Sequence, residues 1–234
     1  MPPFRDRRDA GRILATYLRV YAGQPDVLVL ALPRGGVPVG FEVATALGAP
    51  LDVFLVRKLG VPGHEELAMG AIASGGVQVP NPSVLHQLEI PAATLEAVAA
   101  REGRELARRE RAYRDDCPPP VVAGHTVILV DDGLATGATM RAAVAALRLQ
   151  HPARLIAAVP VGAPETCAEL RREVDELVCV VTPDEFYAVG LWYKDFSPTT
   201  DVDVRALLAE AARRFSPSLG NTNGETTSGQ VSNI

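Results

Sequence analysis

Residues 127–139 read VILVDDGLATGAT, which is four apolar positions, two adjacent acids and then a loop of small residues. The apolar start predicts a buried strand, and the residues around Gly137 predict the start of a helix. Backbone N–H groups at a helix N-terminus favour a phosphate dianion, and glycine lets the backbone approach it closely. Asp131 and Asp132 can accept hydrogen bonds from vicinal ribose hydroxyls and can hold Mg²⁺. The stretch therefore predicts a sugar-phosphate site.

Apolar runs elsewhere in the chain predict the fold. Short β-branched or Leu-rich runs cover residues 27–33, 51–60, 126–133, 154–162 and 176–183. Helix-like segments lie between most of them, at residues 37–47, 137–149 and 164–174. This alternation predicts an α/β fold with a doubly wound, mostly parallel, Rossmann-like sheet. Ligands of such sheets bind outside the carboxyl ends of the strands, so the residues after each strand are the candidate site.

Residues 60–120 interrupt this alternation. They contain a polar Gly-rich stretch, a β-hairpin pattern over residues 69–79 and a charged helix over residues 92–114. Glutamates are interleaved with the arginines of that helix at spacings that allow ion pairs, so we expect a solvated face rather than a nucleic-acid patch. We expect one domain over residues 1–215 with this insertion, and a disordered tail over residues 216–234.

Composition and charge exclude several classes of protein. The net charge of −5 argues against nonspecific nucleic-acid binding, which needs a basic surface. Three cysteines lack metal-type spacing and read as reduced packing residues. No apolar run is long enough to span a bilayer, and the N-terminal stretch lacks a signal-peptide core. We therefore expect a cytoplasmic protein with small-molecule partners, and neither nucleic acid nor membrane.

The motif at residues 127–139 resembles the ribose-phosphate signature of the type I phosphoribosyltransferases. The resemblance extends over about residues 25–200 in motif order, because four separate loops agree with one ligand. It implies Mg²⁺-dependent transfer of the 5-phosphoribosyl group of phosphoribosyl pyrophosphate to a nitrogenous base, with release of pyrophosphate. Asp131 and Asp132 would serve as catalytic residues and metal ligands. The residues implied to bind the 5-phosphate are Ala135, Thr136, Gly137, Ala138 and Thr139.

Two further loops resemble the family's pyrophosphate contacts. The first, PRGG at residues 33–36, resembles the loop that wraps pyrophosphate, often with a non-proline cis peptide, which we expect between Arg34 and Gly35; Gly36 completes this group. Taken alone, PRGG fits a plain turn equally well. The second is Arg57-Lys58, expected at the end of the second strand, with Lys58 as a catalytic residue. Lys58 and Lys194 are the two lysines among 23 basic residues.

Two more segments resemble family elements that complete the site. His64, Glu65 and Glu66 lie where the family carries a mobile loop that excludes water, although a surface loop without a role fits as well. Residues 183–196, within a hood of about residues 183–200, resemble the base-binding segment of 6-oxopurine phosphoribosyltransferases. The resemblance makes Phe186, Tyr187 and Trp192 base-binding residues and Asp195 a metal or pyrophosphate ligand. Simple core packing is the alternative for the aromatic residues.

The resemblance fails at the residues that would identify the base. Ala135 stands where the 6-oxopurine enzymes carry an aspartate, and the lysine expected after residues 154–162 is absent. The acceptor base therefore stays open. A non-catalytic sensor of phosphoribosyl pyrophosphate or nucleotide on the same fold is the main alternative, and a hydrolase or other phosphotransferase is a second one. A homodimer is expected from the resemblance alone.

Overall fold

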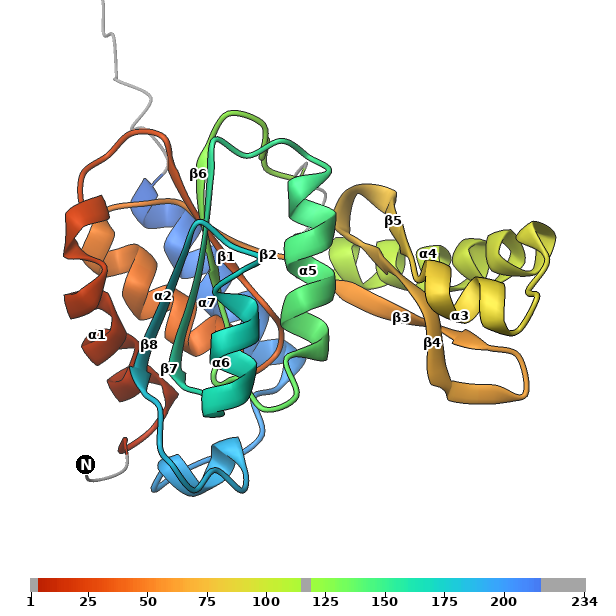
Figure 1. Cartoon of the computed structure of the whole chain (residues 1–234). Coiled ribbons are helices and arrows are strands. Elements are labelled where there is room, and N and C mark those ends of the chain that lie inside the picture. The colour runs from red at the N-terminus through yellow and green to blue at the C-terminus, as the bar shows by residue number, and fades with distance from the viewer. Residues whose placement is uncertain (1–3, 115–118, 216–234) are drawn as a thin grey trace, which may run out of the picture.

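A computed structural model describes residues 4–114 and 119–215. Figure 1 shows a sheet flanked by helices, which we call the body, and a smaller unit of strands and helices that projects from one side of it. We call this projecting unit, residues 56–114, the arm. The predicted tail at residues 216–234 and Cys117 lie outside the described residues.

The body is built on a five-stranded sheet in the order β2-β1-β6-β7-β8, with every neighbouring pair parallel. Its strands are β1 (Val27–Ala31), β2 (Leu51–Val53), β6 (Thr126–Val130), β7 (Arg154–Val161) and β8 (Glu176–Val181). All residues of β1 and β6 are buried, as expected of strands covered on both faces. The predicted doubly wound, mostly parallel sheet is confirmed.

Alternate residues of the central strands face two helical layers. Val27 and Val29 pack in one cluster with α1 (Arg7–Tyr17) and α2 (Gly36–Leu47), whereas Leu28 and Leu30 pack in another with α5 (Ala138–Arg148) and α6 (Pro164–Leu170). Helix α7 (Asp201–Phe215) packs against α2 and β2. Both faces of the sheet are thus closed, and the strand ends are left for a site.

The predicted strand over residues 51–60 is wrong as a single element. It divides at Phe54 and Leu55 into β2 and β3 (Val56–Val61), which belong to different sheets. The backbone N–H of Leu55 donates to the Ser74 hydroxyl at 2.9 Å, so the chain leaves the parallel sheet there. An apolar run is compatible with burial in either sheet, so the sequence pattern does not show where the chain passes from one sheet to the other.

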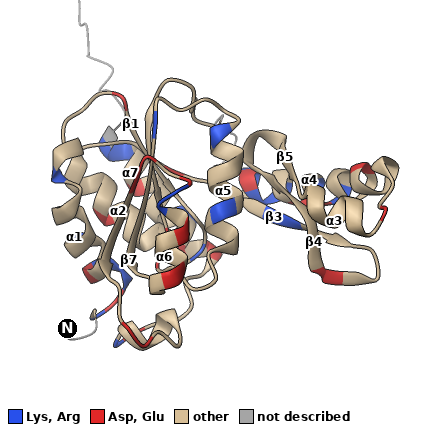
Figure 2. Ribbon diagram, in the orientation of Figure 1, with Lys and Arg blue, Asp and Glu red and all other residues tan. Residues whose placement is uncertain are grey.

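The arm carries an antiparallel sheet and two helices. Strand β3 pairs with β4 (His64–Ala73), and β4 pairs with β5 (Val77–Pro80), which confirms the predicted hairpin. Helices α3 (Pro82–Gln87) and α4 (Ala92–Arg114) follow, and α4 has the predicted bounds. Figure 2 shows basic residues on β3 near the body and acidic residues at the far end of β4.

The hood segment, residues 183–200, lies beyond the carboxyl ends of the strands, at the bottom of Figure 1. It contains a short 3-10 helix, Val189–Trp192, and is tied to the start of the chain. The Phe4 N–H donates to the Trp192 carbonyl at 2.7 Å, and the Lys194 N–H donates to the Phe4 carbonyl at 2.8 Å. The N-terminal segment therefore helps to position the hood.

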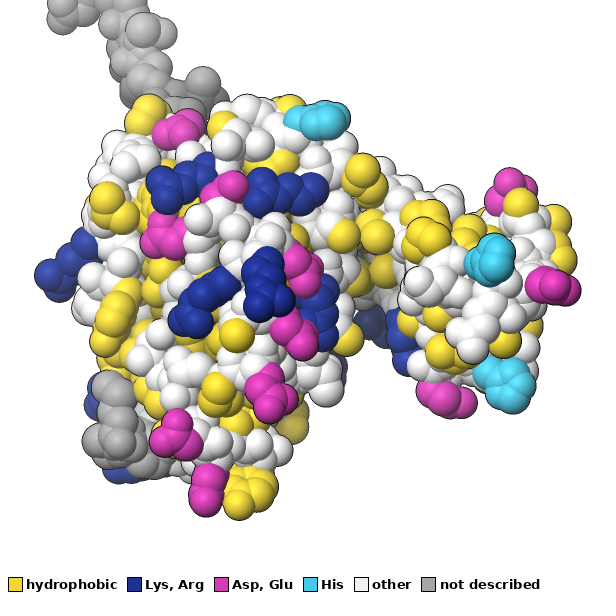
Figure 3. Space-filling view, viewed as in Figure 1, with side chains coloured by type: hydrophobic (Ala, Val, Ile, Leu, Met, Phe, Trp, Pro, Cys, Tyr) yellow, Lys and Arg dark blue, Asp and Glu magenta, His cyan; other side chains and the backbone are white. Residues whose placement is uncertain are grey.

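The molecular surface carries charges of both signs. Figure 3 shows basic and acidic side chains intermixed on the visible face of the body. Within residues 4–114 and 119–215, no helix has the length and apolar character needed to cross a bilayer.

Candidate functional site

The PRGG loop and the acid pair meet because β1 and β6 are neighbours in the sheet. A Cβ added to Gly36 would lie 2.7 Å from the Val130 carbonyl oxygen and 2.9 Å from Asp131 Cα, and one added to Gly35 would collide with the Asp132 carboxylate. Glycine is needed at both positions for this approach. The cis peptide joins Pro33 and Arg34, so the prediction of its place between Arg34 and Gly35 is wrong by one residue.

The small-residue loop after β6 forms a cradle at the start of α5. Gly137, with φ +72°, precedes the helix, and no described side chain caps its first turn. The Thr166 hydroxyl donates to the Ala135 carbonyl at 2.7 Å and so holds the loop in place. The first N–H groups of α5 are thus left without an intrahelical partner, as an anion site requires.

This cradle encloses a cavity of about 170 Å³. Its lining joins one acid of the pair, the whole phosphate loop and one hood residue. The lining residues are Asp131, Gly133, Leu134, Ala135, Thr136, Gly137, Ala138, Thr139, Met140 and Val189. All five residues predicted to bind a 5-phosphate therefore lie around one space.

The two adjacent acids have different environments. Asp131 is desolvated by burial, and the nearby charge of Asp132 adds to this, so the pKa of the Asp131 carboxyl is raised well above its ordinary value. Its Oδ1 accepts the Asp132 N–H at 2.8 Å. Asp132 instead forms a largely buried ion pair, because the Arg7 Nε donates to its Oδ2 at 2.7 Å.

Arg7 is a residue of this site that the sequence did not reveal. It begins α1, its guanidinium lies 3.9 Å from the centre of the Phe196 ring, and it donates to the Ser197 carbonyl at 2.8 Å. Tyr193 also supports the acids, since its hydroxyl donates to the Asp132 carbonyl at 2.5 Å. Nothing in the charged stretch at residues 5–9 marks which side chain reaches the acid pair.

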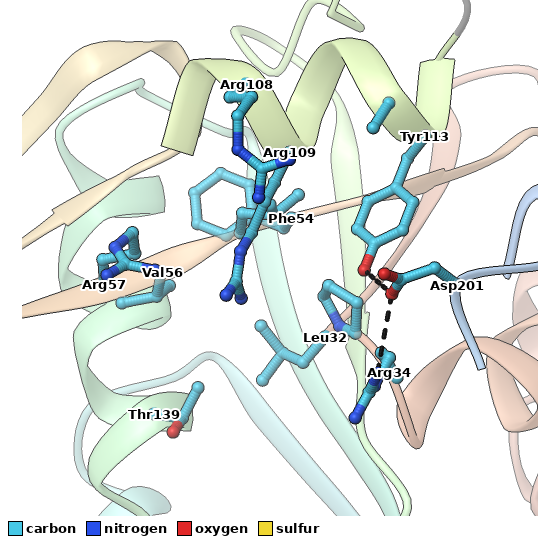
Figure 4. Close-up of a pocket in the computed structure, with 13 residues that line it drawn as sticks. Leu32, Arg34, Phe54, Val56, Arg57, Arg108, Arg109, Tyr113, Thr139 and Asp201 are labelled. Atoms are coloured by element: carbon cyan, nitrogen blue, oxygen red, sulfur yellow. Dashed lines mark hydrogen bonds and ion pairs between the residues drawn. The ribbon is translucent and has the colours of Figure 1, made fainter. Parts of the chain in front are cut away.

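Three of the five predicted pyrophosphate residues line cavities, and these three are divided between two of them. Arg34 and Arg57 line one of about 450 Å³, drawn in Figure 4, and Lys58 lines another of about 350 Å³ between the arm and α5. Adjacent residues of a strand point to opposite faces, which separates Arg57 from Lys58. Thr139 lines both cavities. The Arg57 Nε donates to Glu102 at 2.7 Å, and Lys58 Nζ donates to the Glu66 carbonyl at 3.3 Å.

The residues of the predicted mobile loop lie at the outer end of the arm. His64, Glu65 and Glu66 are exposed and form the first residues of β4. None of them lines any of the three cavities described above. In this structure the start of β4 lies against β3, and it does not contact Asp131 or Asp132.

The aromatic residues of the hood divide into packed and exposed ones. Phe186 and Trp192 pack with Phe4 and Tyr193 in a small cluster, whereas Tyr187 is 79% exposed. Asp195 accepts hydrogen bonds from the backbone and hydroxyl of Ser197 at 2.9 and 2.5 Å. Tyr187 is therefore the hood ring that is most available to a ligand.

The carboxylates fit a magnesium ion that arrives with a substrate. Among the described residues, no group of three or more His, Cys, Asp or Glu side chains could hold a metal ion. The acid pair offers two carboxylates, one of them engaged by Arg7. Mg²⁺ is commonly bound by one or two carboxylates together with substrate phosphates rather than by a protein cage, and this donor set matches that pattern.

The chain matches known proteins over most of its length. A phosphoribosyl transferase domain model matches residues 7–193. Rv0571c of Mycobacterium tuberculosis, named as a candidate phosphoribosyl transferase, is 46% identical over 215 residues, which are 92% of this chain and 48% of that protein. This chain thus spans about half the length of that relative. The crystal structure of TT1426 from Thermus thermophilus is 45% identical, covers 90% of this chain and 99% of its own, and superposes with a TM-score of 0.80.

Proposed function

Because this chain belongs to the phosphoribosyl transferase family, we propose that it transfers the 5-phosphoribosyl group of phosphoribosyl pyrophosphate to a nitrogenous base. The observation that carries this proposal is the meeting of three features at neighbouring strand ends. They are the Asp131–Asp132 pair, the uncapped N-terminus of α5 and the glycines of the PRGG loop. Each matches one part of the donor: the ribose hydroxyls, the 5-phosphate and the pyrophosphate.

The 5-phosphate would occupy the cradle at residues 135–139. Its charge is favoured by the positive end of the α5 dipole and by the unpaired N–H groups there. The hydroxyls of Thr136 and Thr139, both exposed, add donors at the rim. This part of the site recognises a phosphate and is indifferent to the base.

The acid pair would hold the ribose and its developing charge. Arg7 fixes one oxygen of Asp132, which leaves Oδ1 to accept a hydrogen bond from the sugar diol. A positive charge grows on the ribose ring as pyrophosphate leaves, and the nearby carboxylates stabilise it. Mg²⁺, when bound, supplies charge neutralisation at the leaving pyrophosphate, and Asp131 and Asp132 are the residues that would hold it. Asp195 on the hood is a third candidate ligand.

The remaining predicted residues would bind the leaving pyrophosphate and the acceptor base. Arg34, Gly35 and Gly36 would receive the pyrophosphate, with Arg57 and Lys58 reaching it from the arm. Tyr187 would stack on a flat base, a contact typically worth about 1–3 kcal/mol, and Phe186 and Trp192 would complete the base site. His64, Glu65 and Glu66 would then close over the site by a movement of the β3–β4 turn.

A sensor without transferase activity is the second candidate function. Asp132 and Arg57 already have ion-pair partners, Arg7 and Glu102, so ligand would have to share or displace them. The missing base-recognition lysine and aspartate favour the sensor as well. Such a protein would bind phosphoribosyl pyrophosphate and release no pyrophosphate.

Titration of phosphoribosyl pyrophosphate with Mg²⁺, followed by pyrophosphate release across purine and pyrimidine bases, tests the proposal. We expect binding to the wild type, release with at least one base, and loss of both in Asp132→Asn. Glu96→Gln is the matched control, because it makes the same carboxylate-to-amide change at an exposed position of α4. Binding without release would favour the sensor, and undiminished turnover in Asp132→Asn would overturn the assignment.

A further inference from the structure

The cavity of about 450 Å³ lies where the arm joins the body, and its lining is mainly polar. Four arginines surround it. They are Arg34 of the PRGG loop, Arg57 of β3, and Arg108 and Arg109 of α4. Figure 4 shows their side chains around a common space, with Asp201, at the start of α7, as the one carboxylate among the described residues that line it.

The two α4 arginines share a single carboxylate. Nε and one terminal nitrogen of Arg108 donate to Glu105 at 2.7 and 2.9 Å, and the Arg109 Nε donates to the same group at 2.9 Å. These bonds lower the pKa of Glu105 to about 2, so it stays ionised at neutral pH. Two guanidiniums against one carboxylate leave an excess of positive charge at the cavity.

Arg109 has unused donors on the cavity side. Within the described residues, only its Nε makes a hydrogen bond, and Figure 4 shows its guanidinium extending into the space. Arg34 forms an ion pair with Asp201 at 3.7 Å, and its side chain, 54% exposed, makes no hydrogen bond within the described residues. Planar guanidiniums with free terminal nitrogens are the side chains best suited to bidentate phosphate contacts.

The position of α4 relative to the body is fixed by its last turn. Arg114 donates to both Asp52 carboxylate oxygens at 3.0 Å and to the Val53 carbonyl at 2.8 Å. The Tyr113 hydroxyl donates to Asp201 at 2.6 Å. Arg108 and Arg109 are therefore presented to the PRGG loop by an anchored helix.

We propose that this cavity binds an oligophosphate chain of three or more phosphoryl groups, with Arg108 and Arg109 holding the phosphoryl groups beyond a pyrophosphate. The inference rests on the proposed function, because Arg34 and Arg57 are assigned there to pyrophosphate. The volume of about 450 Å³ lies within the range of sites for whole small ligands. Four arginines are paired with three carboxylates, Glu102, Glu105 and Asp201, so an excess of positive charge remains for a phosphate chain. Such a chain belongs either to an inorganic polyphosphate or to a nucleoside triphosphate.

The test compares pyrophosphate with tripolyphosphate by isothermal titration at fixed ionic strength, with and without Mg²⁺. We expect tripolyphosphate to bind the wild type at least about tenfold more tightly, as added charge-assisted hydrogen bonds imply. Replacing both Arg108 and Arg109 by Ala should remove most of this advantage and leave pyrophosphate binding within about twofold. Arg111→Ala, an exposed arginine of the same helix that does not line the cavity, should keep the full advantage.

Two results would overturn the proposal. One is equal affinity of the wild type for the two anions, and the other is an equal loss of both anions in the double variant. A thermal melt of each variant, and partial recovery in the double lysine variant, exclude loss of folding as the cause. Titration of a nucleoside triphosphate identifies which kind of molecule supplies the phosphate chain. Binding tighter than that of tripolyphosphate indicates a nucleotide, and equal binding indicates that the phosphate chain alone is recognised.

The same titrations separate this inference from the proposed function. Asp132→Asn should lose phosphoribosyl pyrophosphate and keep the preference for tripolyphosphate, because Asp132 does not line this cavity. If the wild type binds tripolyphosphate through the α4 arginines but does not bind phosphoribosyl pyrophosphate, the proposed function fails and the oligophosphate site stands. If the wild type binds phosphoribosyl pyrophosphate but does not prefer tripolyphosphate to pyrophosphate, the oligophosphate site fails and the proposed function stands.

Discussion

The acid pair of the body and the Arg108–Arg109 pair on α4 of the arm are held by ion pairs of opposite kinds. In the body, Arg7 reaches Asp132 across 125 positions of sequence, and both side chains are largely buried. In the arm, Glu105 pairs with Arg108 and Arg109, three and four positions away, on an open helix face. Long-range pairs hold the acid site in one geometry, whereas local pairs on an exposed face can exchange partners with an incoming anion.

The largest expected difference between the body and the arm is in the unfolding free energy lost when a packed leucine is shortened. Leu129→Ala at the centre of β6 removes a fully buried side chain between two covered faces, and we expect it to lower the free energy of unfolding by about 4 kcal/mol. Leu85→Ala on α3 of the arm, where the side chain is half-buried, should cost only about 1 kcal/mol. Urea unfolding measures both, and equal losses would show that α3 is packed as firmly as the centre of β6.

The next largest loss of stability is expected at the joint between the body and the arm, where Arg114 pairs with Asp52. Arg114→Ala leaves Asp52 without its partner in a setting where burial already raises the Asp52 pKa, and we expect a loss of about 3 kcal/mol at pH 7. Because a raised carboxyl pKa favours the folded state at low pH, this deficit should grow as the pH rises above about 4. Chemical unfolding between pH 4 and pH 8 checks it, with the exposed Arg111→Ala as control; a pH-independent deficit would contradict the assigned cause.

The sequence predicted most of the body, because its structure follows from local patterns. Strands that are buried on both faces appear in the sequence as continuous apolar runs. In the arm, the charged helix α4 was also predicted with its observed bounds. Membership of the phosphoribosyl transferase family is confirmed by the family match, whereas the transfer reaction itself remains a proposal. The division of residues 51–60 was missed, since it depends on a contact with Ser74, 19 positions away.

The candidate site was predicted where it is local and missed where it is long-range. The acids and the phosphate loop are contiguous, so one motif contains them. Arg7 and Tyr193 support the acids from the two ends of the chain, and no spacing relates them. The α4 arginines were expected on a solvated face with ion pairs; the pairs are confirmed, and two of these arginines also line a cavity. Magnesium, the cytoplasmic location and a homodimer remain predictions, and the acceptor base stays open.

A smaller effect of opposite sign is expected at the acid pair. Asp131→Asn removes a buried charge beside Asp132 while its Oδ1 can still accept the Asp132 N–H, so the variant should be about 1 kcal/mol more stable at pH 7. The wild-type carboxyl has a raised pKa, so its destabilising charge is present at high pH and lost as the pH falls toward 4. The gain in melting temperature should therefore shrink in acid. A gain that persists at pH 4 would point to packing instead.

The smallest effect separates two tyrosine hydroxyls with different acceptors. In the body, Tyr193→Phe leaves the part-buried Asp132 carbonyl without its 2.5 Å donor, so a loss of about 1 kcal/mol is expected. At the joint, Tyr113→Phe frees the Asp201 carboxylate, whose side chain is 59% exposed and can take water in exchange, so a smaller loss is expected. Both rings keep their packing as Phe. Paired urea titrations measure the loss of unfolding free energy in each variant. If Tyr113→Phe costs as much as Tyr193→Phe, water does not replace the lost hydroxyl at Asp201. The charged groups at the joint would then be less accessible to solvent than those on the exposed face of α4.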